Sequence, residues 1–270
     1  MDNPTEAFAQ AAIDLGRKQP VPSVFGDAQF VVHKNDEELH SLESLGAKPM
    51  RKKGIITVRD TTSFLLYFKI HQLGSAIYGS YKPPKFTAVF NDHQRDDAGW
   101  GDHRMVYDCP HSPEWATWIG SDGRQMPQVN FAEFLEDNLP DVIASNESEP
   151  TGAQMLEVAQ SFTAKSDVNF SSAVRLQNGT VQFTYEETTE AKSRGDFKVP
   201  EKFFIGIAVF EQGPKYRMEA RLRYRINGGK LMVWYDILRP HKILEDAVKN
   251  IWDEIQTGTT VQIIHGTPRP

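Results

Sequence analysis

Residues 216–238 constrain the fold most strongly, because charged and apolar side chains alternate there up to a tight turn. Successive side chains of a β-strand point to opposite faces, so the alternation assigns one face of this strand to a core. Asn227-Gly228-Gly229 then reverses the chain, as expected for a hairpin. The apolar face carries Tyr216, Met218, Ala220, Leu222, Tyr224 and Ile226. The opposite face carries Arg217, Glu219, Arg221, Arg223 and Arg225.

The neighbouring segments predict an α+β fold: an antiparallel sheet, rich in hairpins in the C-terminal half, with helices packed mainly on one side. A second hairpin is expected at Gln177-Asn178-Gly179, and residues 203–210 are apolar enough for a central strand. Asn130 and Glu133 have the spacing of a capping box, which predicts that a helix begins at Asn130. The predicted helices cover residues 60–71, 112–119, 130–139, 151–162 and 240–258.

The chain has 270 residues, of which 39% are hydrophobic, and this is enough for one large domain. We expect residues 27–270 to form that domain and residues 1–26 to be an N-terminal arm; an open alternative makes residues 130–162 a separate helical lobe. Residues 29–33 predict a short strand and residues 36–45 a short helix. The N-terminus lacks the features of a signal peptide, and no run of about 18 apolar residues occurs. We therefore expect a cytoplasmic protein without membrane contact.

A row of arginines on one strand face is suited to phosphates or carboxylates, since guanidinium groups are planar and permanently charged. Tyr185 and Trp234 offer aromatic surfaces of the kind used by single-strand binders. The simpler interpretation is a solvated face whose arginines pair with acids such as Glu219 or Glu186. The net charge of −6 restricts any polyanion binding to a local patch. The candidate residues for an anion, a nucleic acid or a subunit contact are Arg217, Arg221, Arg223, Arg225, Lys215 and Lys230.

The segment from Asn91 to His111 is rich in aspartate, glycine and histidine. Carboxylate and imidazole groups bind zinc, manganese or iron, but no recognised metal-binding spacing occurs here. Gly99 and Gly101 indicate a tight surface turn as the simpler alternative. The candidates for a metal site are His93, Asp102, His103 and His111.

The single cysteine, Cys109, excludes a disulfide within the chain. It lies near His103 and His111 in the sequence, where a Cys–His nucleophile pair is one interpretation and a small buried residue the simpler one. No glycine-rich phosphate loop of the Walker or Rossmann type occurs, and we expect no cofactor.

Several segments resemble the YfdQ-like family of phage and prophage proteins over the range from about Gly54 to Gln256. They are Gly101-Asp102-His103-Arg104, Phe131-Ala132-Glu133-Phe134-Leu135-Glu136-Asp137, the strand at 203–210, and the hairpin at 216–238 closing on Arg239-Pro240. The resemblance implies a phage or prophage origin, a bacterial cytoplasm, and a role near DNA replication and recombination. It supplies no catalytic residues.

These observations lead to three functional hypotheses of different classes. The first is a phage accessory protein without catalytic activity that binds nucleic acid or a host replication or defence protein. The second is a homo-oligomeric or cage-like structural protein, in which the basic hairpin pairs with acids of a neighbouring subunit, such as Glu133, Glu136 or Asp137. It is motivated by residues 125–164, which contain seven acids and no lysine or arginine. The third is a metal-dependent hydrolase.

Overall fold

A computed structural model shows that the chain folds into two compact units, Met1–Ile55 and Ile56–Pro270. The structure describes residues 23–25, 28–32, 39–41, 48–72, 74–164, 168–187 and 194–268. The predicted arm, residues 1–26, lies outside this set except at 23–25. The division into an arm and one domain therefore stays a prediction.

The first unit contains a three-stranded antiparallel sheet of β1 (Ser23–Phe25), β2 (Ala28–Val32) and β3 (Leu39–Ser41). The strand predicted at 29–33 corresponds to β2. The helix predicted over 36–45 is wrong at residues 39–41, which pair with β2 as strand β3. Pairing within a sheet decides the conformation of such a short segment, because local propensity is a weak preference.

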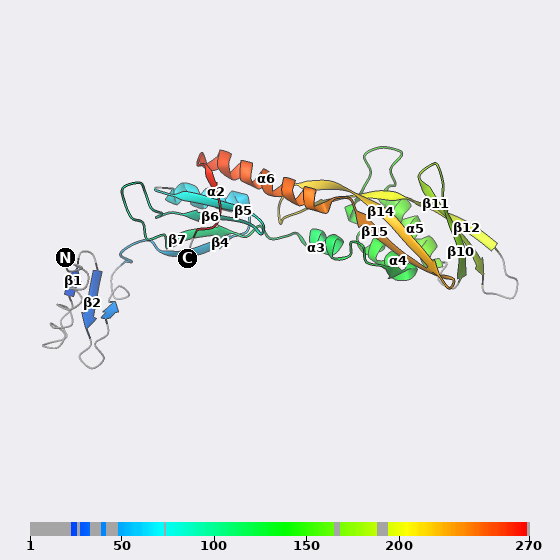
Figure 1. Ribbon diagram of the computed structural model, residues 1–270, viewed down its shortest axis with the longest axis horizontal. Coiled ribbons are helices and arrows are strands. Elements are labelled where there is room, and N and C mark those ends of the chain that lie inside the picture. Colours follow the sequence, from blue (N-terminus) through cyan, green and yellow to red (C-terminus); the bar gives the residue numbers. More distant parts are fainter. Residues whose placement is uncertain are drawn as a thin grey trace. The chain divides into compact units, whose positions relative to one another are not determined.

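The second unit begins with a five-stranded sheet in the order β16-β5-β6-β7-β4. Its strands are β4 (Gly54–Val58), β5 (Ala76–Tyr81), β6 (Pro84–Val89), β7 (His103–Tyr107) and β16 (Ile263–His265). Two helices accompany this sheet, α2 (Thr61–His71) and α6 (Pro240–Thr259). They contact each other, and α6 also contacts β5 and β14, so the last helix connects the two larger sheets (Figure 1).

The contact between α6 and the β16-β5-β6-β7-β4 sheet depends on a close approach of the helix to one glycine. The Trp252 ring stacks on Tyr81, with 5.3 Å between the ring centroids. A Cβ atom on Gly79 would lie 2.4 Å from Cζ3 of Trp252, so no larger residue fits at this position without a shift. From the other helix, Phe64 and Phe68 are completely buried.

The second sheet of this unit has the order β8-β15-β14-β13-β9 and contains the long hairpin. It is called the second sheet below. Its strands are β8 (Met126–Pro127), β9 (Val142–Ile143), β13 (Lys202–Ala208), β14 (Lys215–Asn227) and β15 (Lys230–Ile237). A third, antiparallel sheet consists of β10 (Val168–Arg175), β11 (Thr180–Glu187) and β12 (Arg194–Pro200).

Helices and aromatic side chains fill the inner side of the second sheet. The helices are α3 (Pro113–Gly120), α4 (Gln128–Asp137) and α5 (Gly152–Ala164), with a short 3-10 helix, η2, at Leu139–Asp141. Trp118 of α3 contacts the rings of Phe203 and Tyr235, and the Tyr235 hydroxyl donates to the Trp118 carbonyl oxygen at 2.6 Å. Phe162 of α5 packs on Phe183 of the third sheet, so α4 and α5 share the core with the sheets.

The predicted α+β fold is confirmed, together with both hairpins. In the part of the chain that the structure describes, β16 lies parallel to β5, whereas β5 and β6, and β6 and β7, pair antiparallel. The predicted start of α4 is wrong: this helix begins at Gln128, after Pro127, and Asn130 makes no capping bond. Proline fits at a helix start because its ring presets φ.

Within the described residues, no helix combines the length and apolar character that crossing a membrane requires.

Ser112 connects α3 to the second sheet and provides a test of this fold. Its hydroxyl accepts a hydrogen bond from the Trp115 backbone N–H at 3.0 Å and donates to the Ala208 carbonyl oxygen at 2.6 Å. Ser112→Ala removes the helix cap and leaves the half-buried Ala208 carbonyl without this donor. We expect a loss of about 2 kcal/mol in unfolding free energy. The melting temperature should then fall by about 4–8 °C.

Thr117→Ala is the matched control for Ser112→Ala, because the Thr117 hydroxyl bonds an exposed carbonyl within the same helix. Its melting temperature should remain near that of the wild type. Equal melting temperatures for Ser112→Ala and Thr117→Ala would contradict the capping role of Ser112.

Candidate functional site

The outer face of β14, called here the arginine face, carries Arg217, Glu219, Arg221, Arg223 and Arg225 as the alternation predicts. On the opposite face Met218, Ala220 and Leu222 are at most 2% exposed. The strand register brings side chains from the neighbouring strands onto the arginine face. Lys202, Phe204 and Gly206 of β13 lie opposite Arg221, Glu219 and Arg217. Asp236, Trp234 and Met232 of β15 lie opposite Arg221, Arg223 and Arg225.

Three of the four arginines pair with carboxylates of the same chain. Arg217 lies 2.5 Å from Glu149, Arg221 lies 2.8 Å from Glu219, and Arg223 lies 2.7 Å from Asp236. Arg217 also stacks on Phe204, with its guanidinium carbon 3.6 Å from the ring centroid. Over much of its length, the arginine face is therefore a solvated surface whose arginines pair with acids, which is the simpler of the two interpretations of the sequence.

The two least exposed carboxylates are held in their charged form by these contacts. Hydrogen bonds from Arg221 and then Lys202 lower the pKa of Glu219 below its ordinary value. The pKa of Glu149 is lowered first by the Ser145 backbone N–H and then by Arg217. Both carboxylates are therefore charged at neutral pH and offset the arginines beside them.

The other end of the arginine face, at the turn of the β14–β15 hairpin, has a different charge balance. Arg225 and Lys230 are exposed, and neither forms an ion pair within the described residues. Met232 and Trp234 are half-buried on the same face. We call Arg223, Arg225, Lys230, Met232 and Trp234 the hairpin end.

Lys215, the remaining basic candidate, lies at the opposite end of β14, away from the hairpin end. It lines a cavity of about 480 Å³ together with Glu114, Asp141 and Glu211. The structure thus does not bring Lys215 and Lys230 into one patch.

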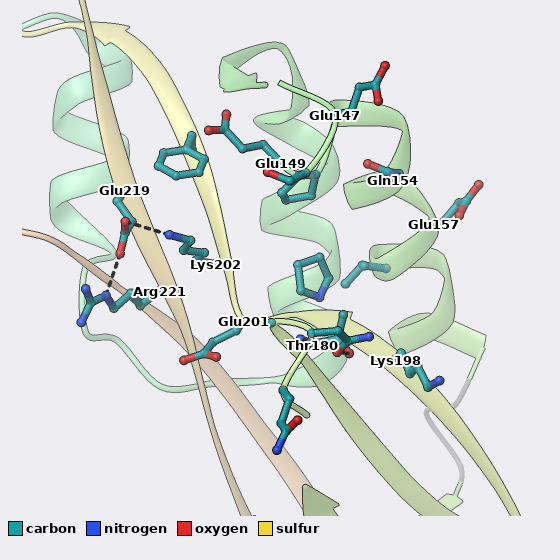
Figure 2. Close-up of a pocket in the computed structure, with 18 of the residues that line it drawn as sticks. Glu147, Glu149, Gln154, Glu157, Thr180, Lys198, Glu201, Lys202, Glu219 and Arg221 are labelled. Atoms are coloured by element: carbon teal, nitrogen blue, oxygen red, sulfur yellow. Dashed lines mark hydrogen bonds and ion pairs between the residues drawn. The ribbon is translucent and has the colours of Figure 1, made fainter. Parts of the chain in front are cut away.

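A larger cavity, of about 910 Å³, lies over the compensated part of the arginine face. Its floor includes Lys202, Phe204, Glu219 and Arg221, and Figure 2 shows Glu219 held between Lys202 and Arg221. Residues of α5 and of the loop before it form one wall, and the turn between β10 and β11 forms another. The acids that line the cavity are Glu147, Glu149, Glu157, Glu201 and Glu219. This excess of carboxylates disfavours a polyanion inside the cavity.

The metal candidates each make separate contacts within the fold. His93 accepts a hydrogen bond from the Gly99 N–H, and Asp102 accepts one from the Asn91 amide. Nε2 of the buried His103 lies 3.2 Å from the Tyr67 hydroxyl, and His111 stacks on Phe210. In the part of the chain that the structure describes, no group of three or more His, Cys, Asp or Glu side chains is arranged to hold a metal ion.

Cys109 is buried, and its surroundings oppose a nucleophilic role. Burial, followed by the charge of Asp108, raises the pKa of the Cys109 thiol to about 12. A thiolate is the reactive form of cysteine, so this thiol remains protonated and unreactive at neutral pH. Burial also lowers the pKa of His111, which keeps this imidazole neutral.

The sequence interpretation missed two of the three carboxylate partners and misplaced one aromatic residue. The sequence predicts Glu219 or Glu186 as partners but not Asp236 or Glu149; within the described residues, Glu186 forms no ion pair with these arginines. Asp236 could have been predicted from the turn at Gly228-Gly229. A hairpin closed there places Asp236 opposite Arg221 and diagonal to Arg223, its partner in the structure. Tyr185, expected as a stacking surface, is 8% exposed and belongs to the core.

Comparison with protein families gives one match, which covers residues 2–268 and is described as an uncharacterized conserved protein, DUF2303. The chain belongs to this family. Searches of curated proteins and of solved structures found no match. Membership of the DUF2303 family therefore groups this chain with its relatives without assigning it a ligand or a reaction.

The lowered pKa of Glu219 predicts how this DUF2303 protein responds to acid. A carboxyl group with a lowered folded-state pKa stabilises the fold above its ordinary pKa, and this contribution is lost as the pH falls through the folded-state value. Glu219→Gln removes the contribution at every pH. The difference in melting temperature between wild type and variant should therefore be largest near neutral pH and shrink between about pH 5 and 3.

Glu157→Gln is the control for Glu219→Gln, because the Glu157 side chain forms no ion pair within the described residues. It should melt as the wild type does across the same pH range. A difference for Glu219→Gln that stays constant with pH would show that its carboxylate is not the stabilising group.

Proposed function

We propose that this chain is a nucleic-acid-binding protein without catalytic activity, and that the hairpin end is its binding surface. We further propose a phage or prophage origin and a place in the cytoplasm of the bacterial host. The resemblance to the YfdQ-like family supports the second part of this proposal. The charge balance of the arginine face supports the first.

The observation that carries the proposal is the uneven compensation of positive charge along one strand. Arg217 and Arg221 contact carboxylates that are 10% and 19% exposed. Arg225 and Lys230 have no such partner within the described residues, and at the hairpin end the register places no acid directly across from Arg223 or Arg225. Positive charge is thus available to a ligand at the hairpin end.

Arg223 can join that ligand because its own ion pair is open to solvent. The Arg223 and Asp236 side chains are 37% and 45% exposed. Exposed pairs of this kind contribute about 0–1 kcal/mol, so a phosphate can replace the carboxylate at little cost. Arginine also binds two phosphate oxygens at once, which makes the exchange favourable.

Charge reversal at the hairpin end tests this proposal. Arg225→Glu/Lys230→Glu should abolish binding of a labelled mixed-sequence DNA strand, measured by fluorescence anisotropy. Because both side chains are exposed and form no ion pair within the described residues, the melting temperature should not change. In the wild type, affinity should fall steeply from about 50 to 200 mM salt, since phosphate contacts release counterions.

Arg217→Glu is the control for Arg225→Glu, because it reverses the same charge on the same strand. It lies eight residues, or about 27 Å, from Arg225, well beyond the screening length of about 8 Å at physiological salt. Arg217→Glu should lower the melting temperature, because the new carboxylate repels Glu149. The affinity for DNA should stay near the wild-type value. Equal binding by wild type and the Arg225→Glu/Lys230→Glu variant would refute the proposed surface.

A second candidate function, self-assembly into a homo-oligomer, is favoured by exposed apolar residues on an edge strand. β4 is the last strand of its sheet, and Ile55 and Ile56 are 68% and 39% exposed. An apolar edge strand without charged residues is a template for pairing with another chain. The pairing of Arg217 with Glu149 reduces the charge available for the acid–arginine contact between subunits that the sequence suggests.

Native mass tests this second candidate. If β4 pairs with another copy, light scattering after size exclusion should give a mass above that of one chain, and Ile55→Lys should return it to the monomer value. Ile264→Lys, on the strand at the opposite edge of the same sheet, is the control and should leave the mass unchanged. A wild-type monomer at micromolar concentration would exclude self-assembly through β4.

A further inference from the structure

Trp234 occupies a special position at the hairpin end. It lies directly opposite Arg223, and Arg221 and Arg225 are its diagonal neighbours on β14. Met232, two residues before Trp234 on β15, lies on the same face. The indole ring is half-buried, and no hydrogen bond or ring contact of Trp234 is found within the described residues.

Three other tryptophans have structural roles that Trp234 lacks. Trp115 and Trp118 are at most 4% exposed in the core, and Trp252 stacks on Tyr81. Trp234 instead lies on the outer face of the sheet, with Arg223 directly across from it, Arg221 and Arg225 diagonal to it, and Asp236 as its neighbour on β15. An accessible aromatic ring among arginines is the arrangement that single-strand binders use, where bases stack on the ring and cations follow the phosphates.

We propose that the hairpin end binds single-stranded nucleic acid, with one base stacked on Trp234 and the flanking phosphates paired with Arg223, Arg225 and Lys230. This inference rests on the proposed function and names its ligand class. The recognised chemistry, an exposed base face next to phosphates, is common to DNA and RNA.

The spacing of Arg223 and Arg225 agrees with the phosphate spacing of an extended nucleic-acid strand. Arg223 and Arg225 are two residues apart on β14, which separates them by about 7 Å along the strand. Consecutive phosphates of an extended single strand are separated by a similar distance. The two guanidinium groups can therefore contact neighbouring phosphates while the base between them lies over β15.

A duplex does not use this arrangement, because its base faces are stacked on one another. Proteins read a duplex through base edges in the grooves, and the central group of this surface is an aromatic face. Trp234 would then contribute little, and binding would depend on the cations alone.

The compensated part of the arginine face limits the length of the bound strand. Glu219 and Glu149 lie beyond Arg221 and repel phosphates, and the adjoining cavity is lined with further acids. We therefore expect a short site of about four nucleotides, at the low end for single-strand binding surfaces.

The test compares four probes of equal length: a thymidine strand, the corresponding RNA strand, an abasic strand and a duplex. Trp234→Leu keeps an apolar side chain and removes the aromatic face. It should weaken binding of the base-bearing single strands roughly 5- to 150-fold, the range for one lost base–aromatic stack. Binding of the abasic strand should not change, and Trp234→Phe should restore much of the loss.

Trp100→Leu is the control, because Trp100 is 76% exposed and lies on a loop outside the second sheet. It should bind every probe as the wild type does, and thermal unfolding should show that all variants fold. Equal wild-type affinity for abasic and base-bearing strands, or tighter binding of the duplex, would overturn the stacking inference and leave the proposed function standing. Failure of all four probes to bind the wild type would refute the proposed function itself.

Discussion

The burial of one face of β14 is the constraint on which the rest of the second sheet depends. Met218, Ala220 and Leu222 point into the core, and Leu222 lies opposite Tyr235, which is hydrogen-bonded to α3. A shift of one residue would bury the arginines and expose these apolar side chains. The register is therefore fixed from the inside, and the row of charges on the outer face is its consequence.

This consequence requires that the repulsion among like charges be relieved along most of the strand. The relieving carboxylates come from three places: Glu219 from β14 itself, Asp236 from β15, and Glu149 from the loop before α5. Each carboxylate acts at short range, so the positive charge is compensated only at the arginines that it contacts. The arginine face is thus a stabilising ion-pair surface over one part and an available cationic surface at the hairpin end.

The parts of this structure that the sequence predicts are those decided by neighbours in the chain. Alternation and Asn-Gly turns identify the hairpins, and Pro240 marks the start of α6. The two-residue strands β8 and β9 have no such pattern, because they exist only through pairing with β15 and β13. The partner of Arg217 is equally hidden, since Glu149 lies 68 residues away and is brought there by tertiary packing.

The position of the available charge follows from one carboxylate more than from the number of arginines. Glu219 holds both Arg221 and Lys202, so it removes two cations from the middle of the arginine face. Without it, the cationic surface would extend from Arg225 to the edge of the acid-lined cavity. With it, the surface ends near Trp234, so the available positive charges and this half-buried aromatic ring lie at the same place. In a chain of net charge −6, the proposed binding of a polyanion depends on such local placement of positive charge.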